Sequence, residues 1–272
     1  MLTIAYDGTN YCGWQVQPNG MTVQERIERA IEKVTGVRTR VLCAGRTDSG
    51  VHAMGQAASF HTDSNIKGAQ FRRALQRYLP NDISIVQTRE VSPEFHATFS
   101  AIRKRYRYMI FDGPVLPPFL RNSVFHHRHE LDVASMKQAL PYLHGTYDFR
   151  CFESSWPNKA TSIRTVMDAT IGRAGHWNIW NNDISWQPTD PRSHADTDNP
   201  LICFEIMADG FLYNMVRAIV GTLFDIGTGR KPPGHMGEVI ASMARSNAGT
   251  TAEPHGLYLV QVDYPEAHLT PP

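Results

Sequence analysis

Short runs of alternating or β-branched residues recur along this chain and predict β-strands. The first run covers residues 2–6 and ends at a turn that begins with Asp7. The further predicted strands lie at residues 39–43, 51–60, 83–90, 99–111, 162–171, 201–207 and 256–264. We therefore expect β-structure to form a large part of the fold.

Apolar residues at helical spacing predict helices between these strands. Thr22 and Glu25 fit a capping box, and the periodic apolar positions that follow end at Gly36. The other predicted helices lie at residues 65–79, 131–143, 211–224 and 235–245. Over the first 90 residues the order is strand, helix, strand, strand, helix, strand, which matches the split βαβ arrangement of a ferredoxin-like unit. The pattern predicts an α+β protein.

The helix predicted at residues 211–224 is the most apolar one, and a single cation, Arg217, lies in its middle. A buried guanidinium group is unfavourable unless it meets an anion or hydrogen-bond acceptors. The chain must then supply a carboxylate or a group of carbonyl oxygens, or Arg217 must extend to the surface along its own aliphatic stem. If the partner is a carboxylate, we nominate Asp48.

The strand predicted at residues 99–111 is the most basic one, and its period of two separates three arginines on one face from Lys104 and two tyrosines on the other. The arginines are Arg103, Arg105 and Arg107, and the tyrosines are Tyr106 and Tyr108. Because three guanidinium groups do not form an ordinary core face, this face is either solvated or bound to an anion. Aromatic residues between the cations favour nucleic acid as that anion.

A similar pair of alternatives applies to the arginines of the helix predicted at residues 65–79. Arg72, Arg73 and Arg77 lie away from its apolar face. They either contact phosphates or form an ordinary solvated helix surface.

Composition narrows the class of protein. The 272 residues, 42% of them apolar, suffice for one large domain or two ordinary ones, and the formal net charge of +1 argues against a polycationic surface while leaving room for a local basic groove. The four cysteines are far apart, which suggests free buried thiols and neither a zinc site nor a disulfide framework. Without a long apolar run or a signal-peptide pattern, a cytoplasmic location is expected.

Residues 44–53 read Ala-Gly-Arg-Thr-Asp-Ser-Gly-Val-His-Ala, and they join two predicted strands. The one carboxylate, Asp48, lies between two glycines and close to Arg46. Such residues also build simple turns, since Asp and Ser bond their own backbone and Gly accepts positive φ. The same position allows a fold to hold one acid rigidly over a cleft.

The longer string Gly-Arg-Thr-Asp-Ser-Gly-Val-His resembles the catalytic signature of the pseudouridine synthases, and specifically of the tRNA pseudouridine synthase A family. Three further segments are similar to motifs of that family: Tyr-Asp-Gly-Thr-Asn-Tyr-Cys-Gly-Trp-Gln near the start, Arg-Tyr-Arg-Tyr in the basic strand, and Gly-Phe-Leu-Tyr-Asn-Met-Val-Arg around Arg217. The resemblance covers residues 2–265. The chain departs from the family pattern at Glu253-Pro254-His255. It also has a polar loop at residues 174–200 that is larger than the family pattern predicts.

The resemblance implies a pseudouridine synthase fold, in which two ferredoxin-like halves join their antiparallel sheets around a central cleft. Residues 1–111 would form the half with the catalytic Asp loop and the basic strand, and residues 112–272 the half with the buried Arg helix. It also implies isomerisation of uridine to pseudouridine at positions 38, 39 and 40 in the anticodon stem-loop of tRNA. No cofactor is needed, and a homodimer is expected in which one tRNA contacts both subunits.

The family assigns roles to residues of this chain. Asp48 would be the nucleophile, Arg217 would pair with it and keep it ionised, and Tyr106 would stack on the target uracil or accept a proton. Arg46 would occupy the space left by a flipped base or hold a phosphate, and His52 would brace the loop or contact the substrate. The predicted substrate-binding residues are Tyr106, Arg46, His52, Arg103, Arg105 and Arg107.

Other functions remain open from the residues alone. A non-catalytic RNA-binding or RNA-folding protein would use the same basic strand, but it has no need of a carboxylate in a groove that attracts phosphates. A glycosidase-like hydrolase normally needs a pair of carboxylates, and no second acid lies near Asp48 in sequence. The polar residues His176, His194, Asp196 and Asp198 suggest a metal site only weakly, since their spacing matches no closed zinc set, and no metal is expected.

Overall fold

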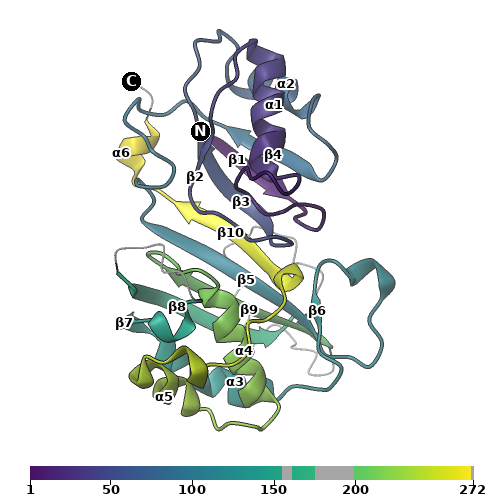
Figure 1. The fold of residues 1–272 in the computed structure, drawn as a ribbon, viewed down its shortest axis with the longest axis vertical. Helices are drawn as coiled ribbons and strands as arrows, with labels where there is room; N and C mark the ends of the chain where they lie inside the picture. The colour runs from purple at the N-terminus through teal and green to yellow at the C-terminus, as the bar shows by residue number, and fades with distance from the viewer. Residues whose placement is uncertain (155–160, 175–198, 271–272) are drawn as a thin grey trace. The chain divides into compact units, whose positions relative to one another are not determined.

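The computed structural model describes residues 1–154, 161–174 and 199–270 (Figure 1). The chain forms two compact units: unit 1 comprises Met1–Lys104 and Tyr258–Pro272, and unit 2 comprises Arg105–Leu257. The C-terminal segment therefore belongs with the N-terminal unit, whereas the sequence-based division assigned residues 112–272 to one half. The metal hypothesis for the loop at residues 174–200 falls on side chains outside the described residues.

The sheet of unit 1 contains four strands in the order β4 (Ile83–Thr88), β1 (Leu2–Tyr6), β3 (His52–Ser59) and β10 (Leu257–Asp263). β1 runs antiparallel to both of its neighbours, whereas β10 runs parallel to β3. A short strand, β2 (Leu42–Cys43), adds antiparallel pairing to β3. Every strand predicted for this unit is present, although only the last two residues of the one predicted at residues 39–43 pair.

Two helices of unit 1 pack against each other, α1 (Val23–Thr35) and α2 (Gly68–Gln76). Thr22 caps α1 by accepting a hydrogen bond from the Glu25 amide, and Gly36 ends the helix in the left-handed region. The Glu25 carboxylate forms an ion pair with Arg29 at 2.6 Å, so its interactions are not limited to the reciprocal capping-box bond with the Thr22 amide. α2 is shorter than predicted, because Lys67 is still extended and carries no side-chain cap. A last short helix, α6, spans Glu266–Leu269.

The sheet of unit 2 has the order β5 (Arg103–Phe111), β9 (Leu201–Ala208), β8 (Ile163–Arg173) and β7 (Gly145–Asp148). β8 is antiparallel to β7 and to β9. A two-residue strand, β6 (Phe125–His126), pairs in parallel with β5. Both units are thus α+β with mixed, mostly antiparallel pairing, which is the predicted class.

The principal helix of unit 2 is α4 (Met215–Gly227), which is buried over most of its surface. It begins later than predicted because Asn214 adopts φ 62°, a left-handed conformation that cannot continue a helix. α3 (Val133–Ala139) is cut short where Pro141 converts the chain to 3₁₀ geometry over Leu140–Leu143. α5 (His235–Ser242) ends at Met243, which also has positive φ.

The remaining 3₁₀ turns of the described residues span Pro118–Leu120, Arg150–Phe152, Arg245–Asn247 and Pro254–Gly256. Across the described ranges, no helix has the length and apolar character that a membrane span requires.

Candidate active site

The loop that carries Asp48 lies between β2 and β3 and is fixed on both sides of the carboxylate. Thr47 accepts a hydrogen bond from the Trp14 amide through its carbonyl oxygen at 3.0 Å, and its hydroxyl lies 2.8 Å from the Tyr6 hydroxyl. The Ser49 hydroxyl donates to the carbonyl oxygen of Tyr11 at 3.1 Å. Asp48 itself is half-buried. The first turn of the chain therefore serves as a platform that immobilises the two neighbours of Asp48.

Close backbone approach explains two glycines of this platform. A methyl group on Gly8 would lie 2.0 Å from the Val51 carbonyl oxygen, and one on Gly13 would lie 2.5 Å from that of Thr47. Gly13 also has φ 83°, which disfavours any other residue. The motif near the start and the motif around Asp48 thus form one structural element.

His52 lies at the start of β3 with only 3% of its surface exposed. The Gly8 amide lies 3.0 Å from its Nδ1, and Asp7 Oδ1 lies 3.2 Å from the same atom. The ring stacks on Tyr258 at a centroid distance of 4.7 Å. These contacts are those of a residue that braces the loop.

Two residues that sequence reasoning did not assign to the loop also hold it. Lys104 donates through Nζ to the Ala44 carbonyl oxygen at 2.7 Å, and Gln56 donates through Nε2 to that of Gly45 at 2.7 Å. Arg46 is exposed between these anchored positions and Asp48. The period of two places Lys104 on the other face from its arginine neighbours, but no local pattern indicates its partner, because that partner is a carbonyl 60 residues away in sequence.

In unit 2, acceptors from the residue that precedes α4 and from a distant segment orient the guanidinium group of Arg217. Arg217 Nε donates to the Ala252 carbonyl oxygen at 2.6 Å, and Nη1 donates to Asn214 Oδ1 at 2.9 Å. Asn214 is held in turn because its Nδ2 donates to the Ser154 hydroxyl at 2.9 Å. Of the partners considered for Arg217, oxygen acceptors of the carbonyl type are present within its own unit.

The segment that supplies Ala252 packs directly on α4. The Ala252 amide donates to the Arg217 carbonyl oxygen at 3.1 Å, and the Gly249 amide donates to the Thr222 hydroxyl at 2.9 Å. A methyl group on Gly221 would lie 1.7 Å from the Thr250 carbonyl oxygen. Only a glycine at this position of α4 allows the segment to approach so closely. The close approach places the Ala252 carbonyl oxygen, which is the acceptor for Arg217.

Tyr106 is 8% exposed, and its ring packs edge-on against Phe211 with the centroids 4.9 Å apart. Phe211 belongs to the segment that leads into α4, so Tyr106 and Arg217 are positioned by neighbouring parts of unit 2. Two residues further along β5, the buried Tyr108 donates its hydroxyl to the Glu253 carbonyl oxygen at 2.7 Å, and burial raises the pKa of this phenol. The segment that departs from the family pattern is thus tied to the basic strand.

The arginine face of β5 is engaged by carboxylates of the protein. Arg105 donates to Glu205 Oε2 at 3.0 Å, and Arg107 donates to Glu205 Oε1 at 2.7 Å. Arg107 and Glu205 are both buried, at 4% exposed each. Of the two alternatives for this face, solvation or binding of an anion, the second applies to Arg105 and Arg107. Their anion is the carboxylate of Glu205 on β9. Their assignment to RNA phosphates finds no support in these contacts.

Arg103 pairs with Asp263 in unit 1, and its side chain remains 47% exposed. Among the three arginines it is the one with substantial surface open to a substrate.

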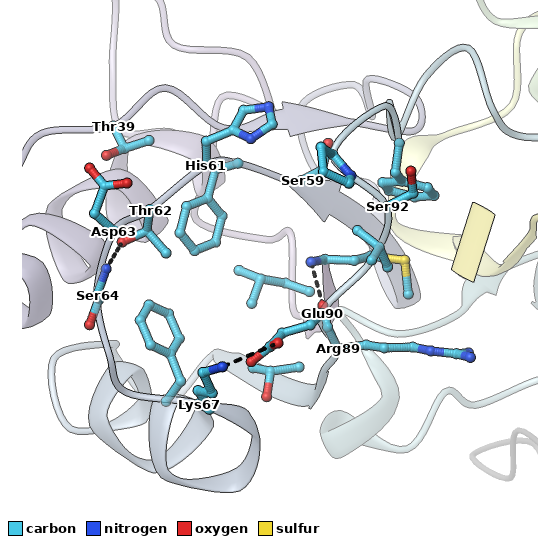
Figure 2. Close-up of a pocket in the computed structure, with 18 of the residues that line it drawn as sticks. Thr39, Ser59, His61, Thr62, Asp63, Ser64, Lys67, Arg89, Glu90 and Ser92 are labelled. Carbon is cyan, nitrogen blue, oxygen red and sulfur yellow. Dashed lines mark hydrogen bonds and ion pairs between the residues drawn. The ribbon is translucent and has the colours of Figure 1, made fainter. Parts of the chain in front are cut away.

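A cavity of about 700 Å³ in unit 1 is separate from these residues, since Asp48 is not part of its wall (Figure 2). Its rim carries charges of both signs, including Lys67 and Glu90, whose charged atoms are 3.8 Å apart. The Met1 amine in its wall donates to the Arg89 carbonyl oxygen at 2.7 Å, and burial lowers the pKa of that amine to about 6. This balance of charge gives the cavity no preference for a polyanion.

The sequence also matches known proteins. The family model described as tRNA pseudouridine synthase matches residues 2–100 and 139–265. The chain is 44% identical over 263 residues to a protein named tRNA pseudouridine synthase A from Acetivibrio thermocellus, covering 97% of this chain and 98% of that one. Proteins of the same name from Thermoanaerobacter sp. and Syntrophomonas wolfei are 42% and 39% identical, each over 97% of this chain and over 98% and 97% of their own lengths.

Proposed function

Because the chain belongs to the tRNA pseudouridine synthase family, we propose that it isomerises uridine to pseudouridine at positions 38, 39 and 40 in the anticodon stem-loop of tRNA. In this reaction the bond from ribose C1′ to N1 of uracil breaks, the base turns, and a bond from C1′ to C5 forms. No group is lost and no redox change occurs. The observation that carries the proposal is the fixed position of Asp48. Hydrogen bonds of its two sequence neighbours hold it in place, and it lies within the region that matches the family model.

We assign Asp48 the role of the nucleophile. A carboxylate on a loop fixed by three hydrogen bonds to residues 6–14 keeps its position before the substrate arrives, which is the condition for efficient positional catalysis. The bulky neighbours Tyr6 and Trp14 are buried and their rings lie 6.1 Å apart, so the support under the loop is rigid.

Asp48, Arg217 and Tyr106 act together in this proposal. Arg217 keeps Asp48 ionised, because a nearby cation favours the charged form of a carboxyl group. The bonds to Ala252 and Asn214 hold its guanidinium group in a fixed orientation. Tyr106 stacks on the uracil, as aromatic side chains do with extruded bases.

The contacts of the other predicted residues separate their roles. Arg46 is exposed beside Asp48, which suits a group that binds a phosphate or replaces the extruded base. Arg103 keeps surface for RNA, whereas Arg105 and Arg107 support β5 through Glu205. The buried His52 acts through the loop that it braces and makes no substrate contact in this proposal.

We further propose that the two units are the ferredoxin-like halves of a pseudouridine synthase fold whose sheets join around a central cleft. The family match over both units supports this arrangement. A homodimer and a cytoplasmic location also remain proposals. Native mass spectrometry with and without tRNA tests the homodimer, and a single monomer mass under both conditions would exclude it.

The experiment that tests the function is tritium release from tRNA labelled at C5 of uracil, since C5 must lose its hydrogen when it becomes the glycosidic carbon. We expect release with the intact protein, none with Asp48→Asn, and full release with Asp63→Asn, a matched control at an exposed carboxylate of the same unit. RNA binding should be equal in all three. Tight binding without release by the intact protein would support the non-catalytic RNA-binding alternative instead.

A further inference from the structure

Helix α2 and its C-cap residue supply three exposed arginines that form no side-chain hydrogen bond or ion pair within the described ranges. They are Arg72, Arg73 and Arg77, and we call them the α2 arginine cluster. Arg29, an exposed arginine of α1, by contrast pairs with Glu25 at 2.6 Å. The α2 arginine cluster is therefore a group of cations for which the fold provides no anion.

No nearby acidic side chain in the sequence balances these cations. The chain has no acidic residue between Asp63 and Asp82, and Arg73 and Arg77 are one turn apart, where like charges destabilise a helix by about 0.2–0.5 kcal/mol. The packing of α2 comes from its opposite face, where Phe71 is buried. The cluster therefore lies away from the packed face of α2, where an external anion can reach it.

The cluster lies at the same end of the unit 1 sheet as Asp48. The chain leaves α2 through Asp82, whose Oδ1 accepts the Tyr11 hydroxyl at 2.6 Å, and Tyr11 accepts the Ser49 hydroxyl through its carbonyl oxygen at 3.1 Å. Two hydrogen bonds through one tyrosine thus connect the residue next to Asp48 with the turn that follows Arg77. A polyanion bound at Asp48 and extending toward the helices would reach the cluster.

We propose that the α2 arginine cluster binds the phosphodiester backbone of the tRNA stem next to the target loop. This inference rests on the proposed function for the identity of the RNA. The helical rise separates the Cα atoms of Arg73 and Arg77 by about 6 Å along the axis, and each guanidinium group can bind a phosphate through two parallel N–H bonds. Tyr78, which is 49% exposed, adds an aromatic surface at the end nearer to Asp48.

The test compares a triple variant, Arg72→Gln, Arg73→Gln and Arg77→Gln, with a matched control. Glutamine keeps a similar helix propensity, so the fold should be unaffected, and circular dichroism checks this. The control removes three exposed cations of unit 2 by Arg128→Gln, Lys137→Gln and Lys231→Gln. Both variants lose the same charge, so a difference between them reports position.

For the cluster variant we expect KM for full-length tRNA to rise about tenfold with kcat unchanged, and the slope of log Kd against log salt to fall by about two to three, one for each lost phosphate contact. For the control we expect changes below about twofold in KM. If the triple variant loses helical signal, the three single variants test the inference instead. In each of them the slope of log Kd against log salt should change by about one.

Three outcomes would overturn the inference: an unchanged KM and salt slope in the cluster variant, an equal change in the control, or a lower kcat at unchanged KM. Failure of the proposed function is distinguishable from these. It would show as absent tritium release by the intact protein, while the salt dependence of tRNA binding still decides whether the cluster contacts the backbone.

Discussion

Asn214 Oδ1 accepts a hydrogen bond of 2.9 Å from Arg217 Nη1, across the first turn of α4. Asn214 is itself outside the helix, at φ 62°, and its Nδ2 donates to Ser154. The left-handed backbone thus turns one side chain back over the start of the helix, where it joins Arg217 to the segment that holds Ser154. The orientation of the guanidinium group depends on a residue that the helix pattern alone would count as helical.

We expect Asn214→Gly to lower kcat by about 10–100-fold with KM within about threefold, because it removes a hydrogen bond to a charged group, worth about 1.5–3 kcal/mol. Glycine accepts positive φ, so the backbone should persist. Asn214→Asp keeps the acceptor for Arg217 and should retain most activity. Equal losses in both variants, measured by tritium release, would show that the acceptor is not what matters.

Gly221→Ala should destabilise the protein, although alanine normally stabilises a helix interior by about 0.5–1 kcal/mol relative to glycine. The added methyl group would lie 1.7 Å from the Thr250 carbonyl oxygen and push away the segment that supplies Ala252 to Arg217. We expect a lower thermal midpoint and reduced turnover. Gly234→Ala, whose methyl group would meet only the Tyr142 hydroxyl at 3.8 Å, is the control and should change neither.

Glu205→Gln should lower the free energy of unfolding by about 3–5 kcal/mol, because it leaves the buried Arg107 without its carboxylate. The double variant Glu205→Leu with Arg107→Met should be more stable than the single one, since it removes both charges. In these variants Arg105 still has a carboxylate partner, because Asp168 lies 3.8 Å from it. Urea titration of the three proteins measures this, and a single variant as stable as the parent would contradict the assigned pairing.

Thiol alkylation should depend steeply on pH. Burial raises the pKa of the Cys43 thiol to about 11 and that of Cys151 to about 12. Only the thiolate reacts, so at pH 8 the reactive fraction of Cys43 is about one in a thousand, and its rate with iodoacetamide should rise about tenfold per pH unit up to about pH 11.

In urea both thiols should react with a pKa near the ordinary value of 9.0. Because Cys43 directly precedes the Asp48 loop, peptide mapping of its alkylation also reports opening of that loop. Rapid alkylation of Cys43 at pH 8 in the folded protein would contradict the raised pKa of this thiol.

Local sequence patterns predicted most of the fold. The prediction for β1 has the observed bounds, and the other predicted strands agree with observed ones to within a few residues, because alternation and β-branched content are visible within a short window. The short strands β6 and β7 were not predicted. Helix ends were less accurate where one residue decides them, as Asn214 does for α4 and Pro141 does for α3. Positive φ at a non-glycine residue leaves no periodic signal.

By itself, the sequence determined the α+β class, the succession of elements, the family and Asp48 as the candidate carboxylate, since each depends on neighbouring residues or on contiguous motifs. The tertiary structure decided which groups meet: Glu205 with Arg107 across 98 residues, and Ala252 with Arg217 across 35. It also showed that Tyr258–Pro272 belongs to the first unit. Such pairings depend on which surfaces pack together once the elements have formed, and no local window contains that information.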